Sequence, residues 1–145
     1  MNKVCTILIP IYWTKYRKKP KVVKLKTKTK YVYEEVILVG FNWYRNAFHI
    51  DQNNCKKEFE SIINKQLKLI KPIDNSFAIK STLYYSNILS DAGNVIPMLE
   101  KFVLDALQES GIVKNDNVKY HKKHLGWEVF EDKINPRLEI EVWSI

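Results

Sequence analysis

The chain has 145 residues, of which 46% are hydrophobic, and this length and composition predict one domain with a buried core. Its net charge of +8, from 24 Lys and Arg against 16 Asp and Glu, favours a polyanionic partner, either nucleic acid or an acidic membrane. No apolar run approaches the roughly 18 residues of a membrane span, and the N-terminal stretch has no signal-peptide cleavage site. Cys5 and Cys55 match no metal-ligand spacing, so we expect reduced thiols in a cytoplasmic protein.

The strongest charge feature follows the first predicted strand, Lys3–Ile11. From Lys15 to Lys30 there are nine basic residues and no acidic one, and the last four lysines alternate with Leu25, Thr27 and Thr29. This period of two predicts a β-ribbon at about 15–33 with one lysine face. The aromatic residues that flank it are Tyr12, Trp13, Tyr16, Tyr31 and Tyr33.

Lysines on a ribbon neutralise phosphates, and aromatic rings stack on exposed bases, so this segment favours nucleic-acid binding. The alternative is a solvated edge strand that its lysines keep from aggregating. Like charges repel unless a partner neutralises them, and this favours the functional interpretation. The predicted DNA-binding residues of the ribbon are Lys15, Arg17, Lys18, Lys19, Lys24, Lys26, Lys28 and Lys30.

The middle of the chain predicts a short strand, a loop and a helix. Glu35–Val39 is the strand, and the aromatic cluster Phe41–Asn46 after it is predicted to be a loop. In that loop Arg45 is a candidate contact to a sugar-phosphate backbone, whereas Trp43 is predicted to cover the core. A helix capped by an asparagine at 53 or 54 and ending near Ile70 follows.

Two carboxylates bracket the next helix. A strand from Phe77 to Leu89 leads to Asp91, and Pro97 is predicted to fall in the first turn of the helix that follows. After this helix a polar turn presents Asp116. Because Mg²⁺ prefers oxygen ligands, Asp91 and Asp116 at the two ends of one helix-and-loop unit predict a cation site, with Lys101 on the helix between them.

The C-terminal part predicts a basic segment and two strands. The basic segment is predicted to contact phosphate beside Asp116, with Lys119 and Lys122 as DNA-binding residues, and its other basic members are His121, Lys123 and His124. The alternating stretches Leu125–Phe130 and Arg137–Trp143 predict a closing antiparallel hairpin. The element order β-β-β-α-β-α-β-β predicts a single α+β domain, in which two helices pack on one face of a mixed β-sheet.

Together these motifs resemble RusA-type Holliday-junction resolvases, especially those encoded by phages of Gram-positive bacteria. The family pattern is Asp-x-Asp-Asn at a strand end, a helical Lys before Asp-Ala-Leu, a Gly, and an acidic pair. The resemblance covers about 40–142. The matching residues are Asp91 and Asn94 for the first motif, Lys101 four residues before Asp105-Ala106-Leu107, Gly111 for the Gly, and Asn115-Asp116 for the pair.

The resemblance implies a Mg²⁺-dependent crossover junction endodeoxyribonuclease, with Mn²⁺ as a substitute ion. It implies a homodimer that cuts opposed strands of a four-way DNA junction in recombination and repair, in the cytoplasm of a bacterium that hosts the phage or prophage. Asp91 and Asp116 would hold the metal, and Lys101 would bind the phosphate or the transition-state charge. Alternatives are a non-catalytic DNA-binding relative and a regulatory protein-interaction module.

One departure from the family pattern bears on catalysis. Gly93 stands where the family has its second Asp, and Glu100 or Asp105 are candidates to replace that carboxylate. If residues 91 and 93 lie in an extended segment, Gly93→Asp would place a second carboxylate on the same side as Asp91.

Overall fold

The structure is a computed structural model that describes residues 1–87 and 92–145. In these ranges the elements are β1 (Asn2–Ile9), β2 (Tyr12–Lys24), β3 (Thr29–Leu38), α1 (Phe41–Asn46), α2 (His49–Leu67), β4 (Phe77–Tyr85), α3 (Ala92–Glu109), β5 (His121–Glu131) and β6 (Arg137–Ser144). Strands β1, β6, β4 and β5 form one sheet in this order, and β2 and β3 form a separate two-stranded ribbon. No helix within the described ranges is long and apolar enough to cross a membrane.

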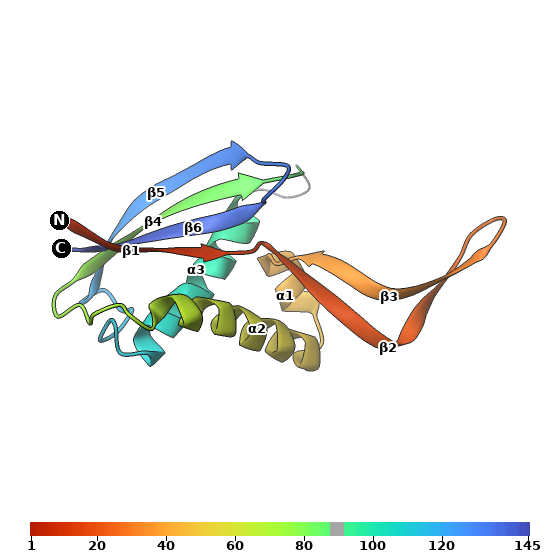
Figure 1. The fold of residues 1–145 in the computed structure, drawn as a ribbon, viewed down its shortest axis with the longest axis horizontal. Coiled ribbons are helices and arrows are strands. Elements are labelled where there is room, and N and C mark those ends of the chain that lie inside the picture. Colours follow the sequence, from red (N-terminus) through yellow and green to blue (C-terminus); the bar gives the residue numbers. More distant parts are fainter. Residues whose placement is uncertain (88–91) are drawn as a thin grey trace.

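The α+β fold class is confirmed, because α2 and α3 pack on one face of a mixed four-stranded sheet (Figure 1). The sheet is central to the core because β4 lies between two neighbours and is buried along almost its whole length. On β6, the alternate residues Leu138, Ile140 and Val142 are buried. Against this face α3 places its own apolar stripe, which includes Leu99, Phe102 and others. Burial of these apolar surfaces is the main stabilising contribution to the fold.

The predicted closing hairpin is wrong, because β5 and β6 are not neighbours. Strand β4 lies between them, parallel to β5 and antiparallel to β6. Helix α3 explains the difference. It carries the chain back along the sheet, so that β5 starts at the same end as β4 and pairs with one of its edges. The other edge of β4 is then available to β6.

The aromatic cluster Phe41–Asn46 is helix α1 rather than the predicted loop. The backbone N–H of Asn42, in the first turn, donates to Asn94 Oδ1 at 2.9 Å, which supplies a hydrogen-bond acceptor for this helix start. The amide of Asn94 lies so close to Gly40 that a Cβ at position 40 would overlap it. Trp43 is partly buried against the core and its ring contacts Trp13, which confirms its predicted structural role.

Two other element boundaries differ from the prediction. Helix α2 begins at His49, before the predicted asparagine cap, and Asp51 lies in its first turn, where a carboxylate interacts favourably with the helix dipole. Strand β4 ends at Tyr85, whereas the predicted strand continued to Leu89, which lies outside the described residues.

Gly93 and Pro97 both lie within α3, and neither position is the predicted one. Pro97 is the sixth residue of the helix and therefore belongs to its second turn, where its missing N–H removes the bond to the carbonyl of Gly93. Gly93 lies in a helix, so the two-residue alternation of side-chain directions in an extended segment does not apply to position 93. A carboxylate placed there would project from the first turn of α3.

We expect Gly93→Ala to stabilise the protein by up to about 0.5 kcal/mol, because glycine loses more backbone freedom than alanine on entering a helix and residue 93 lies in the first turn, where the effect is smaller than in the interior. Gly93 is exposed, which makes room for the added methyl group. Chemical denaturation of both proteins measures the difference, and Gly111→Ala is the matched control. Gly111 has φ of 78°, so a Cβ there is strained and the control should destabilise. A loss of stability in Gly93→Ala would contradict this prediction.

Both cysteines are free thiols in the structure. Burial raises the pKa of Cys5, and it raises the pKa of Cys55 to about 12. At neutral pH each side chain is therefore a thiol rather than the reactive thiolate.

Candidate functional site

The β2–β3 ribbon projects from the body of the protein, at the end away from the two termini (Figure 1). We call residues 12–38 the basic arm. A ribbon is present as predicted, but its lysines do not share one strand face. Strand β2 ends at Lys24, and a turn follows in which the N–H of Leu25 donates to the carbonyl of Lys28 at 2.8 Å. The four alternating lysines are therefore distributed around the end of a hairpin.

A large bulge divides the arm into two parts. Tyr16 pairs with Glu34 and Lys21 pairs with Val32, so that the four residues 17–20 lie opposite Tyr33 alone. Bulges bend a ribbon and increase its twist, and Pro20 suits one because it has no N–H to donate to a partner strand. The bulge also places two of the predicted DNA-binding residues, Lys18 and Lys19, in exposed positions.

The charges of the arm fall into two groups. At its base, Lys15 forms an ion pair with Asp51 at 2.6 Å, and Arg17 forms one with Glu35 at 2.7 Å. The first pair holds the arm against α2, the second joins its two strands, and both neutralise predicted DNA-binding residues. In the described ranges, no ion pair forms at the other lysines of the arm, which are Lys18, Lys19, Lys21, Lys24, Lys26, Lys28 and Lys30.

The remaining predicted DNA-binding residues lie outside the arm. Arg45 is exposed in the last turn of α1. Lys119 and Lys122 line a depression next to Tyr120, at the start of β5, which is the end of the sheet opposite the arm (Figure 1). The predicted DNA-binding residues therefore do not form one continuous surface.

A cavity of about 380 Å³ is lined by both Lys101 and Asp116, two of the predicted site residues. It lies between α3, the turn before β5 and the first residues of β5. The cavity residues that belong to α3 are three or four positions apart, so their side chains lie on one face of the helix. The lining residues are Ile79, Pro97, Glu100, Lys101, Leu104, Asp105, Asp116, His121 and His124.

Two bulges in β5 place its histidines beside this cavity. His121 pairs with Phe77 and His124 pairs with Ile79, so three residues of β5 span two residues of β4. A second extra residue precedes Trp127, next to Gly126, whose φ is 99°. Each bulge shifts the alternation by one position, so residues 121, 124 and 127 all face α3. The sequence predicted both histidines only as members of a basic segment that contacts phosphate, and it did not predict that they face α3, although Gly126 is a signal of irregularity in the strand.

Glu100 is 6% exposed and forms the centre of a polar network. The N–H of Gly126 donates to His124 Nδ1 at 3.0 Å, which selects the tautomer with its proton on Nε2. His124 Nε2 then donates to Glu100 Oε2 at 2.6 Å, and Trp127 Nε1 donates to Glu100 Oε1 at 3.3 Å. Both carboxylate oxygens are therefore occupied, which makes Glu100 a poor replacement for the carboxylate that Gly93 lacks.

We expect Glu100→Ala to destabilise the protein by about 1–3 kcal/mol, because it leaves the N–H groups of His124 and Trp127 without their acceptor. Urea unfolding followed by tryptophan fluorescence measures the effect. Glu109→Ala, at an exposed position of the same helix, is the control and should change stability by less than about 0.5 kcal/mol. Equal effects in the two variants would show that the network contributes nothing.

His121 is the second histidine of the cavity. Its ring stacks on Phe77 with centroids 4.9 Å apart, and its Nε2 is buried without a hydrogen-bond partner among the described residues. Burial, with a smaller contribution from nearby His124, lowers the pKa of His121, although Glu100 and Asp116 oppose this shift. At neutral pH the ring is therefore uncharged and able to accept or donate one proton at Nε2.

Only part of the predicted cation site lies within the residues that the structure describes. Asp116 is exposed beside the cavity, whereas Asp91 lies outside the described residues. Over residues 1–87 and 92–145 no group of three or more His, Cys, Asp or Glu side chains is arranged to hold a metal ion. The described donors therefore do not make a complete metal site by themselves.

The comparisons with known proteins add no assignment to this geometry. No protein-family model and no curated protein matches the chain. The resemblance to junction resolvases therefore stays a prediction, and the function has to be argued from the arm and the cavity.

Proposed function

We propose that the protein binds branched DNA through the basic arm and cleaves a phosphodiester at the cavity beside α3. The observation that carries this proposal is the arm. It extends away from the body, and its outer lysines have no ion-pair partner in the described part of the chain (Figure 1). Such a surface gains affinity from each phosphate that it neutralises, because bound counterions are released.

The cavity contains side chains suited to phosphodiester chemistry. Lys101 is an exposed cation that would bind a non-bridging phosphate oxygen and offset the charge that develops during cleavage. Asp116 provides a hard oxygen ligand on the same cavity, and in our proposal Asp91 provides the second. A bound Mg²⁺ or Mn²⁺ would polarise the phosphate.

A second candidate function is DNA binding without cleavage. Two observations favour it, since the described residues contain no metal-binding cluster and Gly93 supplies no carboxylate. A protein of this kind would keep the arm and use the body as a scaffold.

A single experiment separates these functions. A labelled four-way junction and a linear duplex of matched sequence are incubated with the protein in EDTA, Mg²⁺ or Mn²⁺. Metal-dependent cutting of the junction alone supports the nuclease, and binding without cutting in any metal supports the non-catalytic relative. If the protein shows no salt-dependent binding to either DNA, both proposed functions are overturned. The partner of the basic arm would then be an acidic protein.

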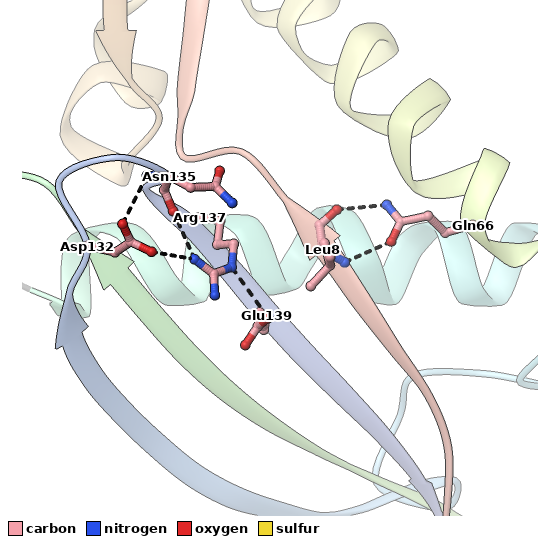
Figure 2. A network of polar contacts seen from close by, with 6 residues as sticks. All are labelled: Leu8, Gln66, Asp132, Asn135, Arg137 and Glu139. Carbon is pink, nitrogen blue, oxygen red and sulfur yellow. Dashed lines mark hydrogen bonds and ion pairs between the residues drawn. The ribbon is translucent and has the colours of Figure 1, made fainter.

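We also propose a homodimer, because two opposed strands require two symmetric sites. The apolar side of α2 is buried within the subunit and is therefore not available as an interface. The free edge of β1 is blocked at Leu8, whose backbone N–H and carbonyl both bond the side chain of Gln66, at 2.8 and 2.7 Å (Figure 2). The other sheet edge, β5, exposes the apolar side chains of Trp127, Val129 and Phe130.

An exposed apolar edge strand pairs readily with a second chain, and a lysine on that edge prevents the pairing. We therefore expect the mass of two chains by light scattering at micromolar concentration, and the mass of one chain for Val129→Lys. Val36→Lys, which places the same charge at an exposed position of β3, is the control and should stay dimeric. A wild-type protein that remains a monomer with and without DNA would refute the dimer.

A further inference from the structure

The outer part of the basic arm has one exposed apolar face. Val22 pairs with Tyr31 across the ribbon, so the two side chains point to the same side. Tyr33 lies two residues after Tyr31 on β3 and therefore shares this side. The exposed fractions of Val22, Tyr31 and Tyr33 are 53%, 59% and 54%. We call these three residues the tyrosine face.

The surroundings of the tyrosine face indicate what covers it. A two-stranded ribbon is marginally stable alone in water, so exposed aromatic side chains on it gain most from a partner. Lys24 follows Val22 by two residues on β2 and lies on the same side, whereas Lys21 and Lys30 point to the other side. Between Lys15 and Tyr33 the sequence has no acidic residue. Aromatic rings beside Lys24, on a ribbon segment without acidic residues, suit a polyanion that also offers flat faces, which nucleic acid does.

A ring can stack on a base only where the face of that base is free. In an intact duplex each base face is covered by the next base pair, so stacking requires unpaired bases. Side chains two residues apart on one strand are separated by about 6.7 Å, which is close to twice the spacing of about 3.4 Å between successive nucleotides. At this separation the two tyrosine rings match two bases of one strand that have a single base between them, rather than two direct neighbours.

We propose that the tyrosine face is a binding site for unpaired DNA bases, with Tyr31 and Tyr33 as the stacking residues. The inference rests on the proposed DNA binding and refines it. The preferred substrate contains a single-stranded segment, such as a gap or an opened branch point, and fully paired DNA binds through the lysines alone.

The test compares two fluorescently labelled duplexes of equal length, one fully paired and one with a central gap of unpaired thymidines. The wild-type protein should bind the gapped DNA more tightly. The double variant Tyr31→Leu, Tyr33→Leu keeps the apolar bulk and removes the rings. It should lose at least about thirtyfold in affinity for gapped DNA, from about 1 kcal/mol or more for each of the two stacked bases. Its affinity for paired DNA and its salt dependence should not change, because no charge is altered.

Two further variants test whether the effect depends on aromatic rings and on their position in the arm. The double variant Tyr31→Phe, Tyr33→Phe retains both rings and should bind gapped DNA like the wild type. Phe48→Leu removes an exposed ring outside the arm and should have no effect. Thermal unfolding of each variant shows whether the fold is intact.

The outcomes separate this inference from the function on which it rests. Salt-dependent binding to both DNAs, with no preference for the gap or no effect of the leucine variant, overturns the tyrosine face and leaves DNA binding in place. Equal losses on gapped and paired DNA also overturn it. If the wild-type protein binds neither DNA, both the inference and the proposed function fail.

Discussion

Replacing the four lysines around the end of the basic arm with glutamine is expected to weaken DNA binding and to reduce its salt dependence. These residues are Lys24, Lys26, Lys28 and Lys30. Each phosphate contact to duplex DNA contributes about −0.9 to the slope of log K against log salt, so four lost contacts would change that slope by about 3.6. Between 50 and 200 mM salt, such a slope corresponds to roughly a hundredfold change in affinity. Fluorescence anisotropy over a series of salt concentrations measures both quantities.

The matched control removes four exposed lysines from the body of the protein. Lys57, Lys65, Lys68 and Lys71 lie on or just after α2 and form no ion pair within the described ranges. Their replacement lowers the net charge by the same amount, so it shows how much of the effect comes from overall charge alone. If the arm variant and the control have the same salt slope as the wild type, the arm does not contact DNA.

The arm shows what the sequence could and could not predict. Composition and periodicity predicted an extended basic ribbon, and a ribbon is present. The position of its turn was not predicted, because residues 25–28 contain none of the Gly, Asn, Asp or Pro residues that usually mark a hairpin. The alternation of lysines continues through the turn, so periodicity alone suggested one long strand where there are two.

The cavity was predicted only in part, for a similar reason. Lys101 and Asp116 were selected from their positions on and after one helix and from their match to a family pattern, and both line one cavity of the structure. The histidines of β5 were predicted only as members of a basic segment, and their common side facing α3 was not predicted, because a spacing of three residues does not fit regular strand alternation. Bulges produce this spacing, and they depend on how β5 aligns with β4 across a long sequence separation. Local sequence does not contain that information.

Replacing Asp116 with Asn, or Lys101 with Met, is expected to lower the rate of junction cleavage by about 100-fold or more, the usual effect of removing a group that stabilises transition-state charge. Both side chains are exposed at the cavity, so neither change should unfold the protein. Asp91→Asn should have the same effect as Asp116→Asn if the two carboxylates share one ion. Single-turnover cleavage in Mg²⁺ gives the rate, and binding in EDTA gives the affinity, which should stay within about twofold because the arm is unchanged.

The control variants are Glu109→Gln and Lys114→Met, which remove the same kinds of charge from exposed positions near the C-terminal end of α3. They should cleave at the wild-type rate. Cleavage that survives in Asp116→Asn and Lys101→Met would place the catalytic groups elsewhere. A wild-type protein that binds the junction with the salt dependence of the arm, and cuts it in neither metal, would leave Asp116 without a catalytic role. In that case the missing carboxylate at Gly93 has a direct explanation, because a protein that only binds DNA has no requirement for a second metal ligand.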